Sequence, residues 1–232
     1  GPSNTIIDGS QSGAVVTMIW TPSSTLDGFT LTNGTGSFGA GALPLGGGIM
    51  CWGSDPILRN LIITENTANA GGGIMCVGNP TIVNTLIINN TAVWGAGMRL
   101  ENDASPTLIN TTFFNNQASN GGGALYCQTG AFPTIYNSIM QSNIPEEIYF
   151  YPDDQSSGVR IDYSNITDGE LGVSPGSGSN IEYGVHNIMS NPRFVDQSAG
   201  NFSLTDYSGC LGAGFDTTIV PATDIDGNPR PN

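Results

Sequence analysis

The chain has 232 residues, 19 acidic side chains against five basic ones, and a net charge of −14 at pH 7. So acidic a chain is a poor partner for nucleic acid or an anionic membrane, and it suits an extracellular surface, where acidic residues aid solubility and can recruit Ca²⁺. The five basic residues are all arginines, and no segment is apolar for long enough to span a membrane as a helix. One elongated domain accommodates this length.

The chain begins with Gly1-Pro2-Ser3 and shows no signal peptide, which we interpret as the remnant of processing or trimming. The first repeat unit is accordingly expected to start partway. Four similar units then follow, each opening on small residues that lead into a short apolar run: Gly46–Cys51, Gly71–Cys76, Gly95–Leu100 and Gly122–Cys127.

Each unit continues with a proline and then with two asparagines six residues apart, at Asn60/Asn66, Asn84/Asn90, Asn110/Asn116 and Asn137/Asn143. Self-similarity with a period of about 25 residues predicts a solenoid, in which each unit buries its apolar face by stacking on its neighbours. The apolar runs are short, rich in Ile, Val, Thr and Phe, and bounded by Gly, Pro and Asn, which indicates strands and turns. We therefore predict an all-β fold, a single-stranded right-handed parallel β-helix of about eight coils.

Period-2 alternation within each unit predicts which side chains face inward. Four apolar columns are expected to fill the interior: Ile49/Ile74/Met98/Leu125, Cys51/Cys76/Leu100/Cys127, Leu58/Ile82/Leu108/Ile135 and Ile63/Ile87/Phe113/Met140. Small residues at Ala68, Ala92 and Ala118 mark a tight corner, and the asparagines are expected to form amide ladders along the axis. We favour free buried thiols for the cysteines, although stacking brings Cys51 and Cys76 within reach of a disulfide.

Several segments resemble known bacterial proteins. Gly122–Leu125 is similar to the GGA(I/L/V) element, and Phe113-x-x-Asn116 to the FxxN element, of polymorphic outer membrane protein repeats. Leu26–Gly34 resembles the DGFTITNG coil of secreted bacterial β-helix proteins, and residues 191–196, 208–214 and 224–230 resemble their closing segments. The resemblance implies a pectate lyase-like β-helix at a bacterial cell surface. It does not imply one activity, because this fold hosts lyases, hydrolases, adhesins and stalks.

The chain is expected to form one domain, 1–232, in three parts: regular coils over 4–143, an irregular acidic insertion over 144–190, and closing coils with a tail over 191–232. The insertion carries Glu146, Glu147, Asp153, Asp154, Asp162 and Asp168. We interpret it as a solvated loop or cap, with a Ca²⁺ site as the alternative. Asp224-x-Asp226-Gly227-Asn228 resembles a fragment of a Ca²⁺ loop but lacks the distal Glu. No other cofactor or metal site is expected, since His186 is the single histidine.

The candidate binding site is the outward face of the strand that follows each small-residue pair. Its residues are Met50, Trp52, Met75, Val77, Arg99, Glu101, Tyr126 and Gln128. Aromatic rings stack on sugars, and Arg and Glu bind hydroxyl groups, so this column predicts a platform for a polysaccharide or cell-surface glycan. The alternative is ordinary surface, or a face covered by loops or a second chain.

We therefore expect a secreted or cell-surface binding or structural module, such as an adhesin or a carbohydrate-recognition stalk. The alternative is a polysaccharide lyase or glycoside hydrolase that acts on an acidic or a plant or algal polysaccharide. The repeat region has few acids, and Arg99 with Glu101 is the one nearby combination, so no catalytic constellation is evident. An ice-binding face is disfavoured because Thr81, Thr107 and Thr134 form only one threonine column.

One outward strip is unexpectedly apolar. It consists of Ile62, Leu86, Thr112 and Ile139, with Ile88 and Phe114 beside it. Such a strip needs cover, which the segment 144–190 could supply, or a second copy through self-association. The remaining possibility is a register error of one residue, which would exchange the two faces of this strand.

Overall fold

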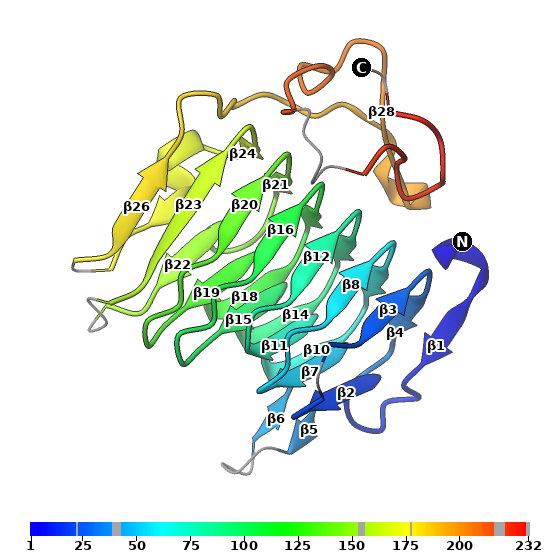
Figure 1. Cartoon of the computed structure of the whole chain (residues 1–232), viewed down its shortest axis with the longest axis vertical. Helices are drawn as coiled ribbons and strands as arrows, with labels where there is room; N and C mark the ends of the chain where they lie inside the picture. The colour runs from blue at the N-terminus through cyan, green and yellow to red at the C-terminus, as the bar shows by residue number, and fades with distance from the viewer. Residues whose placement is uncertain (22, 39–42, 153–155, 177, 216–220, 231–232) are drawn as a thin grey trace.

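The computed structural model describes residues 1–230 except 22, 39–42, 153–155, 177 and 216–220. The chain forms a right-handed parallel β-helix of about six turns, which confirms the predicted fold class with fewer coils than the eight expected. Figure 1 shows the strands stacking in order from the N-terminal to the C-terminal end of the rod. The helices among the described residues are three short 3₁₀ turns, none with the length or hydropathy needed to cross a membrane: η1 (Pro2–Asn4), η2 (Gly169–Gly172) and η3 (Gln197–Ala199).

Each turn contributes one strand to each of three seven-stranded parallel sheets. Sheet A contains β1 (Ile6–Asp8), β4 (Thr30–Thr32), β9 (Ile62–Thr64), β13 (Leu86–Ile88), β17 (Thr112–Phe114), β21 (Ile139–Gln141) and β24 (Asn165–Ile166). Sheet B contains β2 (Val16–Ile19), β7 (Ile49–Trp52), β11 (Ile74–Val77), β15 (Met98–Leu100), β19 (Leu125–Cys127), β22 (Ile148–Phe150) and β25 (Val173–Ser174). Sheet C contains β3 (Thr25–Asp27), β8 (Ile57–Arg59), β12 (Thr81–Val83), β16 (Thr107–Ile109), β20 (Thr134–Tyr136), β23 (Gly158–Asp162) and β26 (Asn180–Tyr183).

A shorter sheet D lies between sheets A and B in chain order within the middle turns. It contains β5 (Ser37–Phe38), β6 (Pro44–Leu45), β10 (Thr67–Ala70), β14 (Thr91–Trp94) and β18 (Gln117–Gly121). Outside the coils, β27 (Phe194–Asp196) and β28 (Asn201–Leu204) form an antiparallel hairpin.

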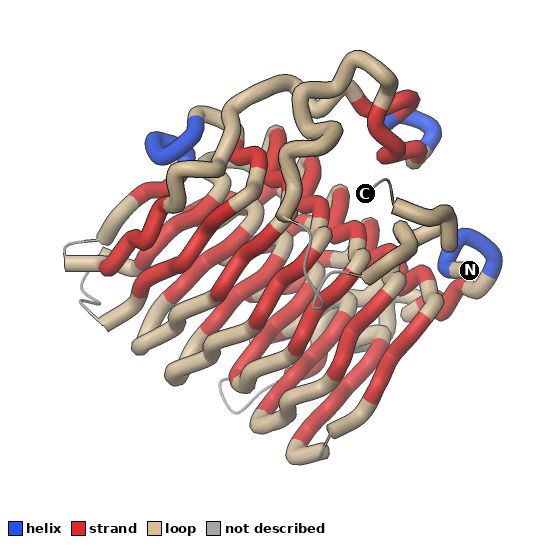
Figure 2. The backbone as a smooth tube through the Cα atoms, turned by 45° about the horizontal axis from the view of Figure 1, so that its top comes forward, coloured by secondary structure: helices blue, strands red, loops and turns tan. Residues whose placement is uncertain are grey.

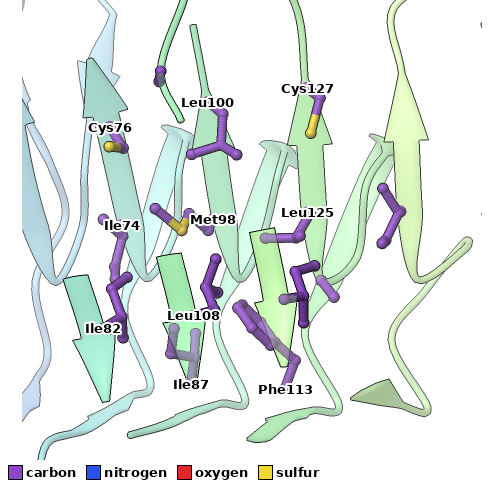
Figure 3. Packing of buried hydrophobic residues seen from close by; sticks show 14 of the residues in the cluster. Ile74, Cys76, Ile82, Ile87, Met98, Leu100, Leu108, Phe113, Leu125 and Cys127 are labelled. Atoms are coloured by element: carbon purple, nitrogen blue, oxygen red, sulfur yellow. The ribbon is translucent and has the colours of Figure 1, made fainter. Parts of the chain in front are cut away.

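The inward columns are confirmed. Ile74 lies opposite Ile49 and Met98 in neighbouring turns, and Ile87 lies opposite Ile63 and Phe113. All of these side chains are fully buried, and Figure 3 shows the columns meeting inside the rod. Burying one such side chain stabilises the fold by roughly 1.5–3 kcal/mol, so the stacked columns supply the main driving force for folding.

Two types of asparagine ladder run along the axis, as predicted. In the inner ladder, which consists of Asn66, Asn90, Asn116 and Asn143, each side-chain amide donates to the Oδ1 of the next rung at 3.1, 3.0 and 2.8 Å. The same amides donate to strand carbonyls, and all four residues are buried. The ladder thus satisfies polar groups that the turn would otherwise leave buried without a partner.

The outer ladder occupies the corner between sheets C and A. Asn60, Asn84, Asn110 and Asn137 have φ values between +48° and +52°, the left-handed region that asparagine tolerates better than most residues. Asn84 donates to Asn60 Oδ1 at 3.3 Å, and Asn110 donates to Asn84 Oδ1 at 3.2 Å. Asn60, Asn110 and Asn137 are half-buried, whereas Asn84 is buried.

Residues 144–183 are not the predicted insertion. Strands β22 to β26 stack on the preceding turns in continuous parallel register. Ile148, Phe150, Val159, Ile161 and Ile166 fill the inward columns and are buried. The β-helix therefore continues after the Gly and Asn markers disappear, because apolar residues at the inward positions suffice to extend it. Asp153 and Asp154 lie outside the described residues.

The segment predicted as closing coils runs instead along the outside of the rod. We call residues 187–215 and 221–230 the strap; Figures 1 and 2 show it leaving the last turn and passing back over the preceding ones. Phe194 and Phe202 pack edge-on against Phe114, with ring centroids 6.0 and 5.3 Å away. The register of the apolar strip is therefore correct, and its cover at Phe114 comes from the strap rather than from residues 144–190.

The four cysteines are free thiols, as favoured from the sequence. Cys51 and Cys76 occupy paired positions in β7 and β11, and their Sγ atoms lie 3.3 Å from the carbonyl oxygens of Ser54 and Gly78 respectively. Burial raises the pKa of Cys210 in the strap, the one cysteine with partial exposure.

Candidate binding groove

The candidate site residues stack in the predicted register along sheet B. Met50, Met75, Arg99 and Tyr126 lie opposite one another in successive turns, and Tyr149 continues the column. They point away from the interior columns, yet Met50, Met75 and Tyr126 are only 4%, 1% and 2% exposed. For Tyr126 the cover comes from sheet D, whose Trp94 packs against it across a concave corner.

Aromatic rings fill this corner. Trp94, from β14 of sheet D, packs edge-on against Tyr126 with centroids 5.3 Å apart, and Tyr149 stacks on Tyr126 at 5.5 Å. The guanidinium carbon of Arg99 lies 4.9 Å from the centre of the Tyr126 ring. Burial raises the pKa of Tyr126, so the phenol remains neutral at physiological pH. Tyr126 therefore forms the floor of the corner, while Trp94 is half-buried at its wall.

The polar groups of the corner form one compact network. Arg99 donates from both Nε and Nη2 to Glu101 Oε1, and Gln128 donates to the same oxygen at 3.2 Å. The side chains of Arg99 and Glu101 are 15% and 17% exposed, which protects the ion pair from full screening by water. The pair presents donors and acceptors together but carries no net charge.

A groove of about 320 Å³ opens beside this network. It is lined by Leu43, Leu45, Asn69, Ala70, Trp94, Arg99 and Glu101. Of the predicted site residues, only Arg99 and Glu101 line it. Met50, Met75 and Tyr126 are buried, and Trp52, Val77 and Gln128 are half-buried outside the lining.

Four groove residues could not be found from strand alternation in sheet B because they belong to sheet D: Leu45, Asn69, Ala70 and Trp94. The sequence did contain a signal for Trp94. It lies in register between Ala70 and Gly121, so one large ring has small neighbours above and below. A large side chain between two small ones in neighbouring turns is not covered by them. Such a position indicates a ring whose surface is available to a ligand.

Three of the acidic residues of 144–183 pair with groups of the chain itself. Glu147 is buried and accepts from Asn143 Nδ2 at 2.5 Å; burial raises its pKa to about 7. Glu146 accepts from the backbone N–H of Gly122 at 2.6 Å, and burial raises its pKa as well. Asp162 lies 3.2 Å from His186 Nδ1. In the part of the chain that the structure describes, no three His, Cys, Asp or Glu side chains gather as metal ligands would.

The Asp224 segment forms a turn in which the carboxylate serves its own backbone. Asp224 Oδ1 accepts from the N–H groups of Asp226 and Asn228 at 2.9 and 2.8 Å. This oxygen is therefore already occupied by the turn.

A family model for the right handed beta helix region matches residues 3–140. No curated protein and no solved structure matches the chain. The family match covers more than half of the chain and coincides with the stacked turns seen in the structure. The chain therefore belongs to the right-handed β-helix family.

Proposed function

We propose that this protein is a binding module, secreted or displayed at a bacterial cell surface, that holds a glycan in the groove between sheets B and D. The observation that supports this proposal is the placement of Trp94 beside the Arg99–Glu101 pair in one concave corner. A ring face for sugar C–H groups then adjoins donors and acceptors for sugar hydroxyls.

The size and shape of the groove suit a short stretch of a chain molecule. Its volume lies at the lower end of small-molecule pockets, about 300–1,000 Å³. Leu43, Leu45 and Trp94 supply apolar wall, and Asn69 adds an amide from sheet D. The groove is open, so a longer oligosaccharide can continue beyond it toward half-buried Trp52 or Gln128.

Charge favours a neutral sugar at this point. Arg99 is neutralised by Glu101, and the whole chain carries −14. The described lining of the groove thus offers no unpaired cation for a carboxylate or sulfate group. Binding of an acidic polysaccharide would require Ca²⁺ or breakage of the ion pair.

The alternative function is a polysaccharide lyase or glycoside hydrolase that uses the same groove. Glu101, held by Arg99 and Gln128, is the carboxylate in the described lining of the groove. Hydrolysis generally needs two carboxyl groups that flank the scissile bond, and the described lining contributes one. Binding without turnover is therefore the proposal.

The experiment is a glycan array on the full chain, followed by incubation of each hit with the protein at high concentration. The proposal predicts retention of neutral oligosaccharides without new reducing ends and without the ultraviolet absorbance of an unsaturated product. Turnover would establish the enzyme instead. Absence of retention on any glycan, with folded protein verified by circular dichroism, would overturn the glycan-binding function.

A further inference from the structure

The outer face of the β-helix holds the strap through contacts with its backbone. Asn137 Oδ1 accepts from the N–H of Phe215 at 2.8 Å, and Asn137 Nδ2 donates to the carbonyl of the same residue at 2.9 Å. Asn165 pairs with Ser190 in the same two-bond manner, at 2.9 and 2.8 Å. A carboxamide that pairs with both polar groups of one residue imitates a neighbouring β-strand, so it recognises extended chain whatever its side chains are.

A third asparagine repeats the pattern in part. Asn84 Nδ2 donates to the carbonyl of Thr223 at 2.9 Å, and Asn84 Oδ1 accepts from Arg230 Nη2 at 3.0 Å. Asn84 and Asn137 are both rungs of the outer ladder, held by the left-handed corner of each turn. The repeat therefore presents the same backbone-reading group at intervals along the rod.

Aromatic contacts add side-chain selectivity to this backbone recognition. Phe215 stacks on Tyr163 at 4.8 Å, and Phe194 and Phe202 pack on Phe114. Phe215 nevertheless stays 43% exposed. The strap is thus held by polar and aromatic contacts at separate points. Among its described residues, Ile188 forms a parallel bridge to Asn165 of sheet A, and none belongs to a strand of sheets A to D.

We infer that Asn84, Asn137, Asn165, Tyr163 and Phe114 form a binding face for extended polypeptide, and that the strap is its intramolecular ligand. The partner that this face fits is the strap of a second copy, which carries the same backbone spacing and the same rings. Exchange of straps between two copies keeps every contact described above and joins the two rods.

The tether sets the concentration at which exchange occurs. A covalently attached segment competes at an effective concentration in the millimolar range, so exchange is suppressed in dilute solution and becomes favourable when copies are crowded. Weakening the strap alone, while the face remains intact, lowers this barrier.

The test uses the full chain and a fluorescent synthetic peptide of residues 187–230 as the probe, followed by anisotropy. Phe215→Ala alters only the strap, and we expect it to bind the peptide about tenfold more tightly than the wild type. Asn137→Gly in that background should weaken peptide binding at least fivefold. The matched control is Asn115→Gly, since Asn115 is a half-buried asparagine at φ +53° that donates to Asn89 in another corner. Glycine avoids strain at both left-handed positions.

A thermal midpoint for each variant verifies folding before binding is measured. Sedimentation of the wild type up to about 1 mM should show a dimer that excess peptide converts to monomer. Equal peptide affinity for wild type and Phe215→Ala, or equal loss in Asn137→Gly and Asn115→Gly, would overturn the binding face. Peptide binding by a chain that stays monomeric at 1 mM would overturn the second copy as the occupant.

Discussion

Asn143 donates its side-chain amide to the buried carboxyl group of Glu147 over 2.5 Å, and this hydrogen bond ends the inner ladder. Every rung from Asn66 onward donates toward the C-terminal end, so the amide dipoles are aligned and their donor end meets Glu147. Glu147 thus takes the acceptor position that a further asparagine would occupy. Burial, however, disfavours its charged form and raises its pKa to about 7.

The first prediction concerns pH. Between the ordinary pKa of 4.5 and the folded value of about 7, the folded state retains a proton that the unfolded state has lost. As pH rises through this window, the free energy of unfolding therefore falls by on the order of 3 kcal/mol because of this group. Above the window it levels off. Glu147→Gln should flatten the curve, because glutamine can still accept from Asn143. Urea titrations from pH 4.5 to 8.5 measure this, and parallel curves for wild type and variant would contradict it.

The buried inner ladder should be far more important for stability than asparagines outside it. Asn116 makes four side-chain hydrogen bonds, with Asn90, Ile87 and Asn143. Asn116→Ala leaves these buried groups unsatisfied and should reduce the free energy of unfolding by about 3 kcal/mol or more. Asn115→Gly, at a half-buried neighbouring position whose side chain donates only to the exposed Asn89, should cost about 1 kcal/mol or less. Similar losses in both variants, measured by urea unfolding, would argue against a special role for the ladder.

Substitution of Tyr126 tests whether the concave corner between sheets B and D is closed around this side chain. The alternation in β19 directs this side chain outward, but sheet D buries it. Tyr126→Ala should therefore destabilise the fold by about 3–5 kcal/mol, and Tyr126→Phe by far less. Tyr207→Ala, in a residue that is 81% exposed, is the control. Calorimetric midpoints that match for Tyr126→Ala and Tyr207→Ala would mean that the corner is open in solution.

Thiol reactivity provides a further check on burial. Cys51, Cys76 and Cys127 are buried, whereas Cys210 is partly exposed and lies 3.3 Å from Asn165 Nδ2. Ellman's reagent should label one thiol per folded chain, more slowly than a free cysteine because burial raises the pKa of Cys210. All four should react in denaturant. Fewer than four thiols after unfolding would indicate a disulfide.

The fold was predictable because aligning the repeat units in sequence shows directly which residues form the inward columns. Ile49, Ile74 and Met98 align in sequence and also in space. Residues 144–183 escaped prediction because Glu147 replaces the next asparagine of the ladder and the Gly pairs are absent, although Ile148 and Phe150 keep the inward pattern. The repeated Gly and Asn residues indicate where the turns lie, whereas the inward positions of a coil require only apolar residues.

The groove was only partly predictable. Arg99 and Glu101 lie on the strand whose alternation was interpreted, whereas Trp94 comes from another sheet. Alternation along a strand shows on which face of its sheet a side chain lies. It does not show the angle between the outer faces of sheets B and D. The burial of Tyr126 against Trp94 therefore depends on the bend between sheets B and D, which no single strand encodes.

The central claim is that the groove at Trp94 binds a glycan. Isothermal titration of the best array hit into wild type, Trp94→Ala and Trp20→Ala tests it most directly, since Trp20 is 73% exposed and is not among the lining residues. The account predicts that Trp94→Ala weakens binding by about 1–3 kcal/mol while Trp20→Ala leaves it unchanged. Equal affinities for wild type and Trp94→Ala, with both proteins folded, would contradict it.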